Sequence, residues 1–149
     1  MGENMPLAMF YFQLHQPFRL HPERGKFLWD DKNREIFLKV AEKCYLPATQ
    51  MFTDLISTHP SFKITLSMSG TFLEQAELYQ PDVIRALQKL LDAGQKKDQV
   101  EYLDETYYHS LTSLFEDPLR LEFREQTSLH REKIRKIFGI FPTSFRNTE

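Results

Sequence analysis

Short apolar runs alternate with helical patterns along this chain, and that alternation constrains its fold more than any other feature. The strand candidates are residues 7–14, 62–68, 100–103 and 141–145. The first run is apolar on both faces, as expected of a buried parallel strand. Strands separated by helices are typical of right-handed βαβ units and a parallel sheet. The sequence therefore predicts an α/β fold with about four parallel strands.

Helix signals fall between these runs. The expected helix starts are Asn33 as a cap, Pro47, Pro81 and the cap-plus-first-turn pair Asp117 and Pro118. The expected helix ends are His59–Pro60, Gly94 and Gly139. Four strands fit a small open sheet or part of an unclosed barrel. Because the last strand would lack a covering helix, we expect residues 1–149 to be the amino-terminal portion of one truncated domain.

Composition limits the partners and the compartment. The net charge is −2 without a basic block, so nucleic acid and anionic membranes are poor partner candidates. The single cysteine, Cys44, cannot form an internal disulfide, and neither a signal peptide nor an apolar run of about 18 residues is evident. These features predict a soluble, cytoplasmic protein.

Polar residues collect where each predicted strand ends, which is where parallel α/β folds place their chemistry. The candidates are His15, Gln16, Glu101, Tyr108, His109, Asn147 and Glu149. Each also has an ordinary reading, such as a histidine bonded to a loop carbonyl or a terminal glutamate exposed to solvent. The other histidines (His21, His59 and His130) look like loop or helix-surface residues.

Other chemistries find weaker support. His15 and His109 are candidate metal ligands with Asp104 as a third, but no HxH, HxxxH or HExxH spacing is present. Ser69 precedes a glycine without forming a G-x-S-x-G elbow. The chain has five glycines and no phosphate-cradling glycine loop.

Four segments, in order along the chain, carry a resemblance to a known family. They are residues 10–17; residues 44–48 followed by Ser69–Gly70 and 73–75; residues 99–101 running into 107–111; and residues 138–139, 142–143 and 145–149. In these segments the chain resembles glycoside hydrolase family 57, in particular its α-amylase-like members. One departure is Asp98, where the family often has a glycine.

The resemblance implies a seven-stranded (β/α) barrel, of which this chain would supply about four strands. It implies a retaining enzyme acting on α-linked glucans without a metal or organic cofactor. Glu149 aligns with the catalytic nucleophile, and His15 and Glu101 align with residues that line the subsite of the cleaved sugar. Adjacency suggests that Arg146 and Asn147 orient Glu149. The family's acid/base aspartate lies on a later strand that is absent here, so we expect this fragment alone to be inactive.

Two other functions stay open at this point. A metal-dependent carbohydrate deacetylase would need a compact Asp/His/His ligand set. A non-catalytic sugar-binding domain would need a chain that ends naturally near Glu149. The substrate, the choice between hydrolysis, transfer and branching, and the oligomeric state are not readable from the sequence.

Overall fold

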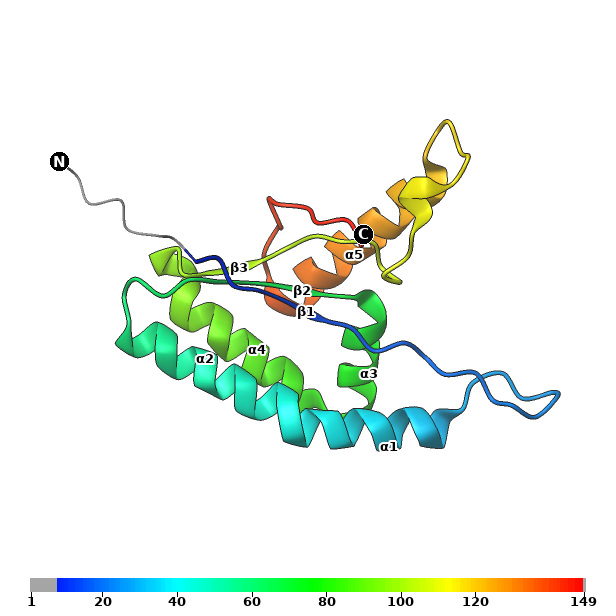
Figure 1. Cartoon of the computed structure of the whole chain (residues 1–149), viewed down its shortest axis with the longest axis horizontal. Coiled ribbons are helices and arrows are strands. Elements are labelled where there is room, and N and C mark those ends of the chain that lie inside the picture. Colours follow the sequence, from blue (N-terminus) through cyan, green and yellow to red (C-terminus); the bar gives the residue numbers. More distant parts are fainter. Residues whose placement is uncertain (1–7, 149) are drawn as a thin grey trace.

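The computed structural model describes residues 8–148 and contains a three-stranded parallel sheet with helices packed against it (Figure 1). The strands, in spatial order, are β1 (Tyr11–Leu14), β2 (Ile64–Met68) and β3 (Val100–Tyr102). Leu14 lies opposite Met68, and Ile64 lies opposite Val100. Because all three strands run the same way, their carboxyl ends meet at one edge of the sheet.

The two faces of the sheet differ in chemistry because successive side chains of a strand point to opposite faces. One face carries the buried side chains of Leu14, Leu66 and Tyr102, which belong to the same core as the helices. The other face carries polar groups from Tyr11, Gln13, Thr65, Ser67 and Glu101. The prediction that the first strand is apolar on both faces therefore holds for only one of its faces.

The helices follow the predicted order with one addition. Their bounds are α1 Asp30–Val40, α2 Leu46–Thr58, α3 Gly70–Tyr79, α4 Pro81–Gly94 and α5 Leu121–Phe138. A π-helical turn, Ala41–Tyr45, joins α1 to α2, and short 3-10 turns occupy Gln95–Lys97 and Thr112–Leu114. None of the helices in the described part of the chain is long and apolar enough to cross a membrane.

The first two helices form one continuous rod rather than two separate elements (Figure 1). Pro47 has no backbone N–H, so the carbonyl four residues earlier cannot be bonded in the α-helical pattern. The chain absorbs this loss in the π-helical turn, where the backbone stays right-handed at Tyr45 (φ −62°, ψ −48°). The turn brings the Tyr45 hydroxyl to 2.9 Å from Nε2 of Gln16, which donates to it.

Asn33 does not cap the first helix, contrary to the prediction. The helix begins one turn earlier, at Asp30, and Asn33 is fully buried within it. Its Oδ1 accepts from the backbone N–H of Arg19 at 2.8 Å, and its Nδ2 donates to the Arg19 carbonyl at 3.3 Å. Asn33 therefore anchors the loop that follows β1.

Helix α3 was not predicted, because the sequence indicated only a turn at Ser69–Gly70. Ser69 has extended backbone angles and its Oγ accepts from the Phe72 N–H at 3.3 Å, which is an N-cap. The helix is buried on most of its surface, including Phe72, Leu73 and Ala76. A helix that is buried nearly all round lacks the one-sided apolar stripe by which sequences reveal helices.

The predicted fourth strand is also absent from the described residues. Residues 141–145 are irregular, and Phe145 makes an isolated parallel bridge with Asp104 beside β3. The long helix begins at Leu121 instead of Pro118, and the Asp117 carboxylate accepts from the backbone N–H groups of Leu119 and Leu121 at its start. Gly139 ends that helix in the left-handed conformation (φ 70°), as predicted.

Candidate active site

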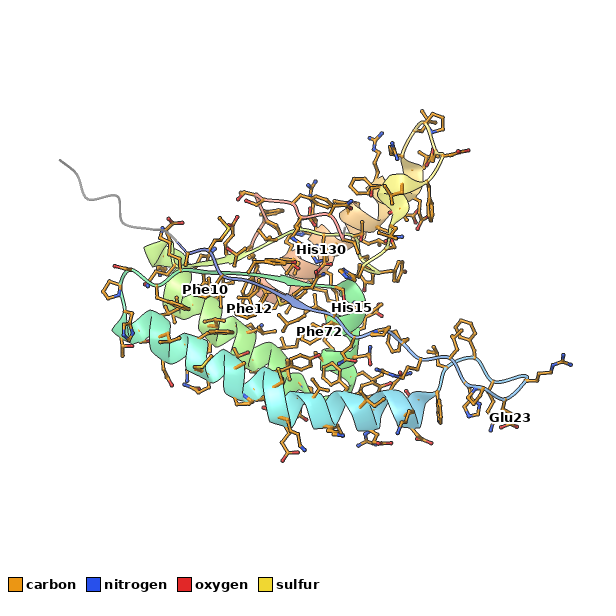
Figure 2. The ribbon with its side chains drawn as sticks, viewed as in Figure 1. Phe10, Phe12, His15, Glu23, Phe72 and His130 are labelled. Atoms are coloured by element: carbon orange, nitrogen blue, oxygen red, sulfur yellow. The ribbon has the colours of Figure 1, made fainter. Side chains whose placement is uncertain are left out.

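The loops after the three strands bring polar side chains together at the carboxyl edge of the sheet. Figure 2 shows His15 at the end of β1. Nδ1 of His15 lies 2.8 Å from Oγ of Ser69, the same atom that caps α3. The cap of a buried helix thus fixes the orientation of a predicted sugar-binding histidine.

The structure brings His15 and His109 together, as the strand-end argument predicted. Their rings lie 4.5 Å apart between centroids, tilted by 36°. Burial, and secondarily the neighbouring His109, lowers the pKa of His15. A neutral imidazole has one donor and one acceptor nitrogen, which suits it to sugar hydroxyls. His109 itself has a positive φ of 55°, so the loop holds it in an uncommon conformation.

A buried carboxyl group, Glu105, lies beside the imidazole of His109. Gln13 donates from Nε2 to Oε2 of Glu105 at 2.8 Å and lies 2.6 Å from Nδ1 of His109. The same Glu105 oxygen lies 3.1 Å from Nδ1 of His109. Burial raises the pKa of Glu105, and its contact with His109 opposes part of that shift. The site therefore contains a carboxyl group that resists ionisation next to His109.

The polar network continues along the sheet face towards the end of the chain. The Tyr11 hydroxyl lies 2.6 Å from Oγ of Ser67 and donates to Oε1 of Gln13 at 3.1 Å. The Arg146 guanidinium lies 4.5 Å from the centre of the Tyr11 ring and donates to Gln13 at 3.4 Å. A cation above an aromatic face is attracted to it, so these contacts hold Arg146 against the sheet.

Glu101 lies on the polar face of β3, at a distance along the strand from the histidines. Its Oε1 accepts from the Ser144 hydroxyl at 2.6 Å, and the side chain is partly exposed. The structure thus connects Glu101 to the segment before Glu149 rather than to His15.

The other predicted site residues lie in different surroundings. Gln16 is buried, and besides its bond to Tyr45 its carbonyl accepts from Nε2 of Gln75 at 2.8 Å. Tyr108 is 51% exposed and packs edge-on against Tyr107. The role of each of these residues towards a sugar remains a prediction.

The chain end returns to this edge of the sheet. Asn147 donates from Nδ2 to the Ser113 hydroxyl at 2.8 Å. Thr148 donates to the Ser110 carbonyl at 3.1 Å, in the loop that contains His109. Figure 1 shows the carboxyl-terminal segment beside the ends of the strands. Glu149, the predicted nucleophile, lies outside the described residues.

The ligand set considered for a metal does not assemble. Asp104 is buried and lies 2.7 Å from Nδ1 of His130, with Arg131 on its other oxygen. Within residues 8–148, no group of at least three His, Cys, Asp or Glu side chains is placed to hold a metal ion. His15 and His109 therefore do not form a metal site with Asp104, the third ligand that the sequence offered.

The predicted site residues did not include three members of this region: Gln13, Glu105 and His130. Gln13 lies in an otherwise apolar strand, and Glu105 lies in an almost fully buried stretch after β3. A polar side chain in such surroundings is costly unless it is paired, and this was the signal that could have identified both as site residues. His130 was interpreted as a helix-surface residue, but it is fully buried. Charged residues follow it in the helix, so the sequence did not indicate that its side chain points into the core.

The sequence also matches known proteins. A family model described as Glycosyl hydrolase family 57 matches residues 9–149. A Methanocaldococcus jannaschii protein named "Putative alpha-amylase" is 42% identical over 151 residues, which cover 96% of this chain and 31% of that protein. The chain thus spans less than a third of the length of this curated relative.

Two solved structures share the fold. A 4-α-glucanotransferase from Thermococcus litoralis superposes with a TM-score of 0.62 at 21% identity, covering 92% of this chain and 18% of that one. A family 57 branching enzyme from Thermococcus kodakaraensis, solved in complex with glucose, gives a TM-score of 0.67 at 14% identity, covering 94% and 32%. With the family match over nearly all of its length, this chain belongs to glycosyl hydrolase family 57.

Proposed function

We propose that this protein acts as a retaining glycoside hydrolase or transglycosylase on α-linked glucans. The observation that carries the proposal is the family match over residues 9–149, which includes the whole polar cluster at the strand ends. The names of the similar proteins support the substrate class, since they describe an α-amylase, a 4-α-glucanotransferase and a branching enzyme. No observation of this structure favours a carbohydrate deacetylase.

The three-stranded sheet would be part of a (β/α)7 barrel. Its polar face, lined by Tyr11, Gln13 and Ser67, would then face the barrel interior, while the helices that cover the apolar face would lie outside. This placement explains why one face of a parallel sheet is polar, since parallel strands covered by helices on both faces are apolar throughout.

In the proposed mechanism Glu149 attacks the anomeric carbon and the leaving oxygen takes a proton from a second carboxyl group. Retaining chemistry places these two groups about 5–5.5 Å apart. The resemblance assigns the second role to an aspartate outside residues 1–149. Water then releases the sugar from Glu149, or a sugar hydroxyl takes its place and the outcome is transfer.

The described residues would bind the sugar rather than break its bond. His15, with its lowered pKa, stays neutral at pH 7 and offers one nitrogen to a hydroxyl while Ser69 holds the other. His109 offers a second ring beside it. We also propose that Glu101, Gln16, Tyr108 and Asn147 line or support the sugar subsites, as the strand-end positions predicted.

The test uses the complete product of the gene and the substitution Glu149→Gln. The variant should lose on the order of 10⁴-fold in the release of reducing ends from maltooligosaccharides, because the amide cannot form the glycosyl ester. Glu132→Gln, on an exposed position of α5, is the matched control and should keep wild-type activity. The anomer of the first product, followed by NMR, reports retention directly. Near-normal turnover by the Glu149 variant would show that another residue is the nucleophile.

A further inference from the structure

We propose that His130 and Asp104 are positioning residues that hold the segment leading to Glu149 at the carboxyl edge of the sheet. This inference rests on the proposed function, because it concerns the placement of the proposed nucleophile. Figure 2 shows His130 on α5, facing the strands. The pair lies outside the set of residues expected to touch the sugar.

His130 joins three parts of the fold through its ring. The side chain is fully buried; Nδ1 lies 2.7 Å from Oδ1 of Asp104 and Nε2 lies 2.9 Å from the carbonyl oxygen of Met68. Both neighbours are acceptors, so each contact is satisfied when the facing nitrogen carries a proton. The ring therefore ties α5 to the last residue of β2 and to the residues just after β3.

Asp104 links His130 to the segment near the end of the described chain. Its carboxylate also accepts from Nε of Arg131 and from the backbone N–H of Glu105. Its own backbone N–H donates to the Ser144 carbonyl at 2.9 Å, and its carbonyl accepts from the Arg146 N–H at 3.0 Å. These two bonds form the parallel bridge at Phe145, four residues before Glu149.

The energetics favour placement over stability as the reason for this pair. A buried hydrogen-bonded pair of polar side chains is seldom more stabilising than apolar residues that fill the same space, because both groups lose their hydration. What apolar residues cannot supply is direction, since hydrogen bonds fix the orientation of both partners. Residues 141–145 form no strand, and the two backbone bonds of Asp104 hold this segment beside β3 together with the Ser144–Glu101 bond.

The experiment compares two substitutions in the complete gene product. His130→Phe keeps an aromatic ring at this position and removes both hydrogen bonds; His130→Gln keeps an N–H donor group and serves if the Phe variant does not fold. Ile134→Val, one turn along the same helix and equally buried, is the matched control for core packing. The readouts are amide hydrogen exchange and the steady-state kinetics on maltooligosaccharides.

We expect the amides of Asp104 and Arg146 to exchange at least about tenfold faster in the His130 variants, while Thr65 in the β1–β2 ladder keeps its wild-type rate. We expect kcat to fall on the order of 10- to 100-fold with KM nearly unchanged, because misplacing a reacting group by about 1 Å has that effect. Ile134→Val should change neither. His130→Gln should recover part of both losses.

The inference is overturned by wild-type exchange at Arg146 in the His130 variants, or by faster exchange with unchanged kcat. A fall in kcat that Ile134→Val reproduces would also overturn it, because the effect would then be one of packing. If the wild-type protein turns over no α-glucan, the proposed function fails by itself. The exchange rates then decide alone whether the pair holds the segment.

Discussion

Ser69 joins the helix cap and the site, so its removal should affect both. In Ser69→Ala the Phe72 N–H loses its acceptor at the start of α3, and Nδ1 of His15 loses its partner. Replacing a serine cap by alanine costs about 1 kcal/mol, and a partly buried hydrogen bond contributes about another 1 kcal/mol. The expected loss is therefore about 2 kcal/mol.

The loss can be read as a shift in the thermal midpoint. At about 2.1 cal/mol/K per residue, a chain of 149 residues has an unfolding entropy of about 0.3 kcal/mol/K, so 2 kcal/mol lowers Tm by about 6 °C. Calorimetry or circular dichroism measures this shift directly. In the complete gene product the same change should weaken maltooligosaccharide binding, since His15 would no longer be held in one orientation.

Ser57→Ala is the matched control for this experiment. Ser57 also donates a hydroxyl hydrogen bond, but to the Thr53 carbonyl within α2, where the backbone already supplies the helix bonds. Its removal should leave Tm within about 1–2 °C of the wild type. A Ser69→Ala protein with a wild-type midpoint would refute the argument that this hydroxyl caps α3, as would an equal loss in both variants.

Two further predictions follow from the charges. Burial raises the pKa of Glu105, so the folded protein keeps a proton that the unfolded chain releases, and stability falls as pH rises from the ordinary glutamate value through the raised one. The unfolding free energy of Glu105→Gln minus that of the wild type should therefore increase from about pH 4 to about pH 8, as measured by urea unfolding. The same free-energy difference at both pH values would contradict this. Asp98 has a left-handed backbone (φ 55°) and an exposed ion pair with Lys63. About 1 M salt screens that exposed ion pair, so the effect of the backbone can be measured without it. Under this condition Asp98→Gly should raise the urea midpoint, because glycine adopts the left-handed conformation without strain. A lowered midpoint would mean that the backbone at Asp98 is not strained.

The strands were predictable because their pattern is local. The runs that contain β1, β2 and β3 are short and apolar, and the proline and glycine signals around α4 have fixed helical meanings. The prediction of a fourth strand was wrong because a strand also needs a pairing partner, which its own sequence does not reveal. Residues 141–145 have strand-like composition, but within the described chain only Phe145 makes a bridge, and that bridge is to Asp104.

The site was predictable in part, because strand ends are identifiable while the contacts between them are not. His15 and His109 meet as predicted, although 94 positions separate them in the sequence, since each follows a strand of one parallel sheet. Asn33 and His130 were both misread. Each lies on a helix among charged residues, and each is buried with a hydrogen-bond partner from outside that helix.

The connection between the sheet face and the loops explains how so short a sheet can orient a site. Gln13 is the central residue: its amide nitrogen reaches Glu105 and His109, while its amide oxygen accepts from Tyr11 and Arg146. Three of these partners follow β1 in the sequence: Glu105 and His109 lie in the loop after β3, and Arg146 lies near the end of the described chain. Because an amide has a donor end and an acceptor end, only one orientation satisfies all four contacts. The position of His109 in its loop is therefore set from within the sheet.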